Sequence, residues 1–490
     1  DKTPIGEYSA VFILCVLAGI RIFIFAAAFP PFNNVDEEHH FDMVYKYSEG
    51  AFPKSAIEPF SPEALRIISQ CQSPEYLLTK DMLNASGVHF SDWADPNIRN
   101  SEPFKRMVSV PENTDNMETG TFPFYYIVAG LWCAVGRFAG LAGKNLVYWI
   151  RFLNVPFFIC LVWFSYLIGR MVFPQNPSQR MAMPLLTAFF PQDTFYVITN
   201  DSLSPVLFAV SFLMVLKILF ERKSNYYVFF TGLVISAAFL TKISNFTVFL
   251  LLFAVLFAKS RLLLTERNFK GFIPLITLSF AAMIPVTLWL LRNHILFGDA
   301  FAVAAKENYF GWKVKTFSQL PDHPIFTLRG CLYFLAELTR TFWRGEIVWH
   351  LKPVASSFTD CFYVFSTAVL VPVAAAALIF KRQTNGRYKF AIGISFGAII
   401  VSVLFLTALS VIYDFSGCWY PSRQLPYFAS GRLISSALIP FLLVYLDGLG
   451  HLFKRGKTVL IIIVMIAALM SASEIILSWP VFNSSYNWFH

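Results

Sequence analysis

Long apolar runs alternate with short polar connections along most of the chain. A helix that crosses a bilayer needs about 20 apolar residues. Runs of this kind lie at residues 8–29, 146–169, 182–200, 203–220, 271–291, 361–380, 390–413, 432–450 and 458–478. The pattern predicts an all-α polytopic membrane protein with about 11 to 13 transmembrane helices, arranged as a single domain over residues 1–490.

Two further apolar runs need a separate interpretation. Residues 226–258 are interrupted at Thr241 and Lys242, which predicts two short helices that meet at this break. Residues 122–142 are apolar as well, but a crossing there would require a return crossing that the sequence does not offer. Either this run is a re-entrant or interfacial helix, or the boundaries assigned to the neighbouring transmembrane helices are wrong.

Composition excludes a soluble enzyme and a disordered chain. The 490 residues are 56% hydrophobic and 14% charged, whereas about 25% of the residues in an ordinary soluble domain are charged. Mean hydropathy is +0.56. The net charge of +9 is not gathered on one basic face, so we expect no nucleic-acid partner, and the lipid bilayer is the expected environment.

The charges are distributed unequally along the chain. Residues 30–121 hold 15 Asp and Glu against 7 Lys and Arg, which leaves +17 for the remainder. Much of that positive charge lies in short connections, and such loops stay in the cytoplasm. We therefore expect residues 30–121 to form a large first outer loop and residues 292–360 a second one that carries an interfacial helix. The N-terminus is then inside and the C-terminus outside.

An acidic and imidazole-rich cluster follows the first apolar run directly. It consists of Asp36, Glu37, Glu38, His39 and His40. One interpretation is the solvated start of a loop. Charge next to a membrane exit is costly unless it is used or solvated, and carboxylates with imidazoles suit proton abstraction or metal binding. In a helix, residues 36 and 40 share a face.

Basic and aromatic residues are expected at the same outer face. The basic residues are Lys242, Arg292, Arg344, Arg423 and Arg432, and the aromatic ones are Trp343, Trp419 and Tyr420. Taken singly, each basic residue is explained as a membrane anchor whose long side chain extends to the polar interface. Each aromatic residue, taken singly, is explained as part of the aromatic belt that membrane proteins have at the interface. Together they suit a phosphate group that enters from the lipid and rings that stack on a sugar. Asp201, beside Asn200, is either a helix cap or part of this site.

The ordered set of motifs resembles the C-type glycosyltransferases (GT-C), which are polytopic enzymes that use polyprenyl-phosphate sugars. It is most similar to the branch of protein O-mannosyltransferases and lipid A aminoarabinose transferase, and to a related bacterial membrane-protein family. The motifs are Asp36-Glu37, residues 121–126, Arg151 with Asn154, Asn200-Asp201, residues 240–242, Arg292-Asn293 with Gly298-Asp299, and Gly431-Arg432. Thr121, Phe122 and Pro123 depart from the His-Pro-Pro that the family usually has.

The resemblance implies transfer of a sugar from a polyprenyl-phosphate donor to a glycan, lipid or protein acceptor, with inversion, at the outer face of a bacterial inner membrane. Asp36 would be the base and Glu37 a supporting carboxylate. Lys242, Arg292 and Arg432 would bind the donor phosphate, with Arg344 and Arg423 as further candidates. Glu38, His39, His40, Asp201 and the three aromatic residues would contact substrate. His39 or His40 would hold a divalent cation in some members.

Three alternatives belong to other classes. A transporter or flippase of a lipid-linked saccharide would use a similar cavity without a base. A saccharide ligase or polymerase would carry its large outer loop late in the sequence. An accessory subunit without activity would not need Asp36 and Glu37.

Overall fold

The protein is described from a computed structural model that covers residues 5–34, 36–73, 75, 79, 81–82, 115–221, 223–380, 386–415, 420–453 and 456–489. Within these residues, nine helical segments are long and apolar enough to cross a membrane. They contain α1 (Ile5–Ala28), α10 (Asn154–Val172), α12 (Ser204–Phe220), α14 (Val248–Thr265), α15 (Phe272–Phe297), α18 (Ser357–Phe380), α19 (Gly386–Ile412), α20 (Leu438–Leu452) and α21 (Gly456–Phe482). The predicted all-α polytopic architecture is confirmed.

Shorter helices and small sheets complete the fold. The shorter α-helices are α2 (Glu37–Ser48), α3 (Pro62–Cys71), α8 (Phe124–Phe138), α9 (Gly143–Arg151), α11 (Pro177–Ala188), α13 (Asn225–Phe239), α16 (Val303–Phe310) and α17 (Leu328–Arg344). The 3-10 helices are η1 (Asp193–Phe195), η2 (Asn200–Ser202), η3 (Ile243–Thr247), η4 (Phe269–Gly271), η5 (Phe317–Gln319), η6 (Pro324–Phe326) and η7 (Gly431–Ala437). Three antiparallel pairs join β1 (Glu58–Pro59) to β2 (Asp115–Asn116), β3 (Lys313–Val314) to β6 (Tyr413–Asp414), and β4 (Val348–Trp349) to β5 (Lys352–Pro353).

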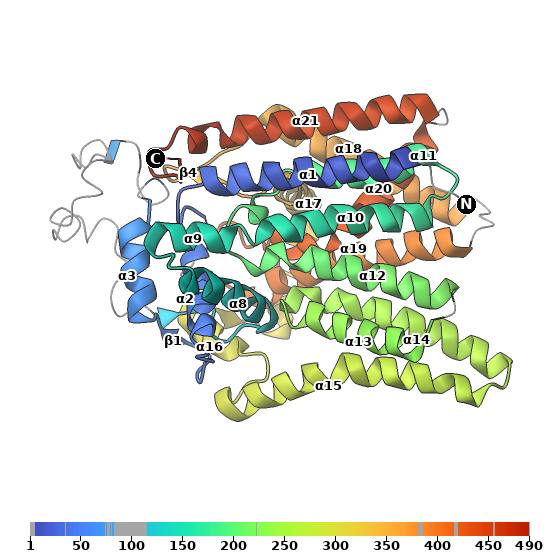
Figure 1. The fold of residues 1–490 in the computed structure, drawn as a ribbon, viewed down its shortest axis with the longest axis horizontal. Coiled ribbons are helices and arrows are strands. Elements are labelled where there is room, and N and C mark those ends of the chain that lie inside the picture. Colours follow the sequence, from blue (N-terminus) through green and yellow to red (C-terminus); the bar gives the residue numbers. More distant parts are fainter. Residues whose placement is uncertain are drawn as a thin grey trace.

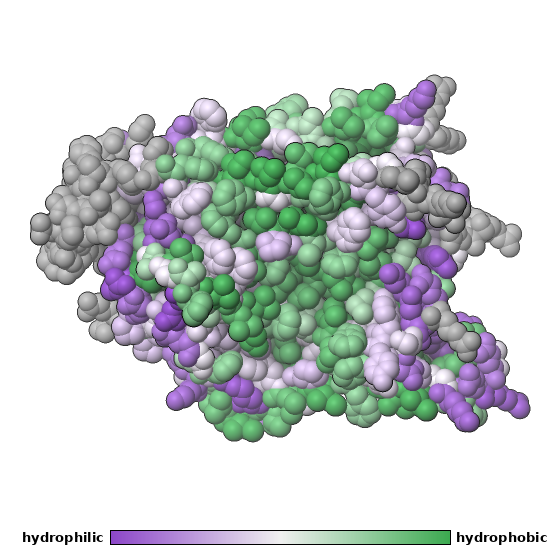
Figure 2. All heavy atoms as spheres, in the orientation of Figure 1, coloured by the Kyte–Doolittle hydropathy of each residue, from purple (hydrophilic) through white to green (hydrophobic). Residues whose placement is uncertain are grey.

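The long helices lie roughly side by side, and the two ends of the bundle differ (Figure 1). One end, here called the cavity end, carries α2, α3, α8 and α16. At the opposite end, here called the basic end, α10 and α12 end and α19 begins. Arg170, Lys217 and Arg387 belong to these helix ends, and Lys270 lies in η4 between α14 and α15. Hydrophilic residues gather mainly at these two ends, and hydrophobic residues cover the middle (Figure 2). This distribution fits a bundle whose middle lies in hydrocarbon and whose ends lie in water.

The predicted break at Thr241 and Lys242 is confirmed. Helix α13 ends at Phe239, and η3 leads into α14 after the break. Helix α13 has 15 residues and is therefore roughly 22 Å long at 1.5 Å per residue. It packs beside α15, where Gly232 allows close approach because an added Cβ would lie 2.6 Å from the Leu278 carbonyl oxygen.

Two apolar runs do not form membrane-spanning helices in the structure. The apolar run at 182–200 is not one helix, because α11 ends at Ala188 and Pro191 cannot continue a helix. Beyond α11 the run contains no α-helix, only the short η1 and the first residue of η2, and residues 190–200 are buried. Such irregular backbone is tolerated at membrane depth where protein covers it. Helix α8 has 15 residues, too few to cross a bilayer alone, and it lies at the cavity end (Figure 1). Among the described residues, nine helical segments are long enough to cross a membrane, and α8 and α13 are shorter apolar helices. The predicted number of 11 to 13 transmembrane helices is therefore reached only if these two short helices are counted.

Candidate functional site

The turn after α1 places Asp36 in an unusual backbone conformation. Pro30 and Pro31 end the helix, and Asp36 is the N-cap of α2 with φ 65° and ψ 5°. Few residues other than glycine adopt this left-handed conformation, and Asp and Asn tolerate it best. The Asp36 side chain does not cap α2. Instead it accepts a hydrogen bond from Nη2 of Arg432 at 2.7 Å.

Glu37 points the other way, into the protein core. Its two carboxylate oxygens accept hydrogen bonds from Nε and Nη2 of Arg151 at 2.7 and 2.6 Å. They also accept from the backbone N–H groups of Phe32 and Ile198, each at 3.0 Å. Both Glu37 and Arg151 are 0% exposed. Glu37 therefore holds the turn that presents Asp36, and it does not reach the cavity where a substrate would react.

A cavity of about 300 Å³ opens at the cavity end and brings together residues from distant segments. His40 lines it from α2, and Asp36 lines it from the turn just before that helix. The two side chains thus reach one cavity, although Asp36 is not part of the helix that the shared face presupposed. Lys242 lines it from the break before η3, and Arg432 lines it from η7. Of the residues predicted from the sequence, the cavity thus brings together a carboxylate, an imidazole and two cations.

Arg432 is the centre of a network of charges. Besides Asp36, its guanidinium lies 3.9 Å from Asp201 and 4.0 Å from Glu346. Asp201 is fully buried and accepts a hydrogen bond from Nζ of Lys242. Since three carboxylates surround two cations, the network already satisfies both cations, and an incoming anion would have to replace a carboxylate.

The electrostatics of the cavity fix the protonation states at neutral pH. Burial alone would raise the pKa of Asp36, but Arg432 and the neighbouring His40 and His39 more than offset it and lower that pKa to about 2. Burial lowers the pKa of His40, although Glu118 and Asp36 act in the opposite direction. Asp36 is therefore ionised at pH 7 and the His40 imidazole is neutral. His40 Nδ1 lies 2.8 Å from the Tyr126 hydroxyl.

The far wall of the cavity is aromatic and apolar. Trp312, Phe405, Leu409, Tyr413 and Phe428 contribute to it. The Trp312 ring lies 5.4 Å from the Tyr413 ring and 5.6 Å from the Phe428 ring. One cavity therefore offers both charged groups and flat apolar faces.

Three further charged residues line the cavity, and none of them belongs to the motifs found in the sequence: Glu118, Lys306 and Glu307. Glu118 pairs with Lys306 of α16 at 2.9 Å. Glu118 precedes the Thr121-Phe122-Pro123 motif by a few residues, but nothing in its own surroundings marks it in the sequence. Glu346 of the charge network is also new, and it lies in the same segment as Arg344.

Three of the predicted phosphate-binding arginines do not line the cavity. Arg292 donates to the backbone oxygen of Pro53 and lies 4.5 Å from the Trp289 ring centroid. Arg344 is buried and pairs with Asp360 at 2.7 Å. Arg423 is 61% exposed and pairs with Asp414 at 3.0 Å. The structure brings together only Lys242 and Arg432 of the five predicted cations.

The predicted substrate-contacting residues also separate into groups. Trp343 is 0% exposed and stacks on Tyr363 at 4.8 Å, so it cannot stack on a sugar. Tyr420 is half exposed, and its hydroxyl accepts from the backbone N–H of Ala429, away from the cavity lining. Trp419 lies outside the described residues. Glu38 and His39 pair with each other at 3.4 Å and do not line the cavity.

A metal site would require several ligands that converge. Among the described residues, no group of three or more His, Cys, Asp or Glu side chains is arranged to hold a metal ion. His39 pairs with Glu38, and His40 contacts Tyr126 and lies 3.5 Å from Thr199. We therefore assign these two imidazoles no metal.

Comparison with known proteins gives a family. No curated protein matches the sequence. Among solved structures, the chain is similar to an oligosaccharyltransferase from Archaeoglobus fulgidus, crystallised with zinc and sulfate, at 12% identity and a TM-score of 0.40. The similarity covers 93% of this chain and 53% of that one, so the chain spans about half the length of that structure. A family described as "Predicted membrane protein (DUF2142)" matches residues 20–414, a range that contains Asp36 and Lys242. The chain therefore belongs to the DUF2142 family of predicted membrane proteins.

Proposed function

We propose that the protein is a membrane glycosyltransferase that moves a sugar from a polyprenyl-phosphate donor to a glycan, lipid or protein acceptor. The observation that carries this proposal is the meeting of Asp36, Lys242 and Arg432 in one cavity with an aromatic wall. The proposal places residues 30–121 and 292–360 in outer loops and the cavity at the outer face, because it lies opposite the basic end. In a bacterium this is the periplasmic face of the inner membrane.

The two cations suit the phosphate of the donor. Arg432 presents a planar guanidinium that matches phosphate geometry, and Lys242 adds a point charge. Both are satisfied by carboxylates in the structure. A donor phosphate that takes over the hydrogen bond from Nη2 of Arg432 would release the Asp36 carboxylate. Binding of the donor and release of the base are then the same event.

The released carboxylate would act on the acceptor. Asp36 takes the proton of the acceptor hydroxyl or amine as that atom bonds to the anomeric carbon. The bond from the anomeric carbon to the phosphate oxygen breaks, and its electron pair leaves on the polyprenyl phosphate. One displacement from the opposite face inverts the anomeric centre. A carboxylate is a sufficient base in inverting glycosidases, whose transition state is oxocarbenium-like.

The leaving group needs cations more than it needs an acid. A polyprenyl phosphate leaves as a stable anion, and fixed positive charge where negative charge develops lowers the barrier. Lys242 and Arg432 supply that charge. The wall of Trp312, Tyr413 and Phe428 supplies faces on which the sugar or the first isoprene units can pack.

The experiment uses the purified full chain in lipid nanodiscs with a panel of polyprenyl-phosphate sugars. Release of polyprenyl phosphate is followed for the wild type, for Asp36→Asn and for the control Asp322→Asn, which changes an exposed carboxylate outside the cavity. The proposal expects turnover of at least one donor by the wild type and by the control, and none by Asp36→Asn. Saturable donor binding without turnover by the wild type would contradict it and favour a transporter of lipid-linked saccharides.

A further inference from the structure

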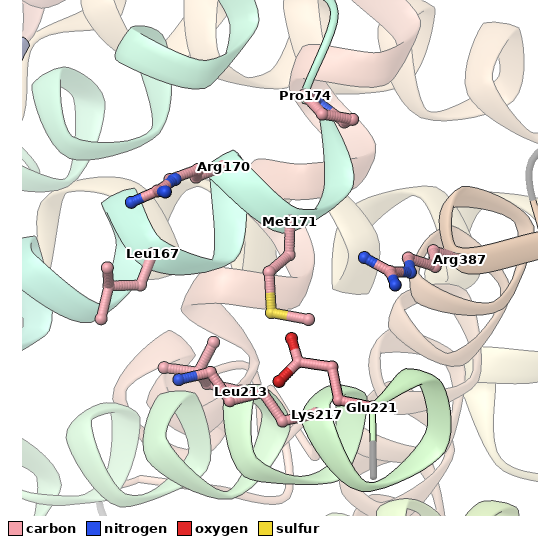
Figure 3. A pocket seen from close by; sticks show the side chains of 8 residues that line it. All are labelled: Leu167, Arg170, Met171, Pro174, Leu213, Lys217, Glu221 and Arg387. Atoms are coloured by element: carbon pink, nitrogen blue, oxygen red, sulfur yellow. The ribbon is translucent and has the colours of Figure 1, made fainter. Parts of the chain in front are cut away.

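A second, larger cavity of about 540 Å³ lies at the basic end. It is formed by the ends of α10 and α12 and by the start of α19, and Figure 3 shows its lining side chains. Helix α12 has 17 residues between the two cavities, which corresponds to roughly 25 Å. Because Asp201 precedes one end of α12 and Glu221 follows the other, this cavity is separate from the proposed transfer site.

The lining of this cavity is mainly cationic. Arg170, Lys217 and Arg387 contribute positive charge, and Glu221 is the single carboxylate among the lining residues. Glu221 is itself paired with Lys223 at 2.6 Å. Lys217 makes no ion pair with any residue that the structure describes. The lining of the cavity therefore holds three cationic side chains and one carboxylate, and that carboxylate is already paired.

Aromatic residues orient both arginines. The guanidinium of Arg170 lies 5.8 Å from the ring centroid of Tyr8 and donates to its hydroxyl. The guanidinium of Arg387 lies 5.6 Å from the Phe220 ring and donates to the Phe220 carbonyl oxygen at 3.4 Å. In Figure 3 the Arg387 side chain points toward the space between the helices. A planar guanidinium matches the geometry of a phosphate.

The same cavity has an apolar part. Leu167, Met171 and Leu213 line it beside the charged groups, and Figure 3 shows the Met171 thioether between the charged side chains. Methionine adapts to irregular apolar ligands. A ligand that carries a phosphate and a short apolar stretch would satisfy both parts, whereas free phosphate would use only the cations.

We propose that this cavity binds the phosphate of an anionic membrane lipid in the leaflet at the basic end. Its place at the helix ends is the depth of the headgroups, and basic pockets between transmembrane helices on that side suit anionic headgroups. The cavity binds a lipid that is not consumed, so this site is independent of the transfer reaction proposed above.

The test measures lipid binding to the delipidated full chain in detergent by native mass spectrometry. The probes are dioleoyl phosphatidylglycerol, dioleoyl phosphatidylcholine and inorganic phosphate. The site variant is Lys217→Gln with Arg387→Gln. Its matched control is Lys270→Gln with Lys389→Gln, which removes the same charge from exposed positions at the same end but outside the cavity.

The proposal expects tighter binding of phosphatidylglycerol than of phosphatidylcholine by the wild type and the control. The site variant should bind phosphatidylglycerol about 25-fold more weakly, since each cation near an anionic lipid contributes about fivefold. Equal weakening in the control, or no weakening in the site variant, would overturn the proposal. Displacement of phosphatidylglycerol by equimolar inorganic phosphate would instead assign the cavity to a soluble anion. If the site variant does not fold, Met171→Trp fills the cavity without changing charge and should also prevent binding.

Discussion

The carboxylate of Asp36 and the guanidinium of Arg432 meet at 2.7 Å, although 396 positions separate them in the sequence. This contact joins the turn after the first membrane helix to the 3-10 helix before α20. It also makes the proposed base and the proposed phosphate-binding group partners in the absence of donor. A substitution at either residue should therefore change the charge environment of the other.

Loss of the Arg432 charge should reduce transfer strongly. In Arg432→Gln the departing phosphate loses a fixed donor, and removal of one such donor typically lowers kcat by about 10²–10³. Steady-state release of polyprenyl phosphate measures this effect. The matched control is Arg423→Gln, because Arg423 is exposed and lies outside the cavity lining, and it should retain activity within about twofold. Equal loss in both variants would contradict the assignment of Arg432 to the phosphate.

Loss of the Glu37 charge should act on folding rather than on chemistry. Glu37→Gln leaves the fully buried Arg151 without its charge partner, and breaking such a pair costs about 3–5 kcal/mol. Denaturant unfolding in detergent should show this loss. The double variant Glu37→Gln with Arg151→Met should recover part of it, since no buried charge then stands alone. A stable but inactive Glu37→Gln would instead place Glu37 in the reaction.

The backbone at Asp36 predicts which substitution leaves the fold intact. Because Asp36 is in the left-handed region, Asn fits there, whereas Ala is disfavoured by about 1–2 kcal/mol. Both substitutions remove the charge that faces Arg432. Asp36→Ala should therefore unfold at lower denaturant than Asp36→Asn by about that free energy. Equal unfolding midpoints would show that the turn adopts another conformation in solution.

Glu75 predicts a pH dependence outside the membrane. Burial raises its pKa to about 7, although hydrogen bonds from Ser484 and Ser73 act in the opposite direction. The ordinary pKa of 4.5 applies in the unfolded chain, so between about pH 4.5 and 7 the folded protein binds more protons. The free energy of unfolding should fall as pH rises through this window and level off above it, by on the order of 3 kcal/mol.

Glu75→Gln isolates that effect from those of the other titratable groups. The variant stays neutral, so it should be more stable than the wild type at pH 8 and about equally stable at pH 4.5. Unfolding curves of both proteins at the two pH values measure the difference. A variant that is less stable than the wild type at pH 8 would show that Glu75 is ionised and favourably paired.

The sequence predicted those parts of the fold that depend on local pattern. Lys242 between two apolar runs predicted the helix break between α13 and η3. The opposite directions of Asp36 and Glu37 depend on one backbone angle that spacing does not reveal. Trp343 could not be placed in the core in advance, because its aromatic partners Tyr363 and Phe190 are distant in sequence. Whether Arg344 faces the cavity or Asp360 likewise depends on helix packing.

In the proposed reaction, Asp36 acts in the chemical step and not in retention of the donor. Binding of a polyprenyl-phosphate sugar and its single-turnover transfer should be measured separately for the wild type and Asp36→Asn in nanodiscs. We expect Asp36→Asn to bind the donor at least as tightly as the wild type, because Arg432 no longer has to leave a charged carboxylate, and we expect its transfer activity to be lost. Transfer at the wild-type rate by Asp36→Asn would contradict it.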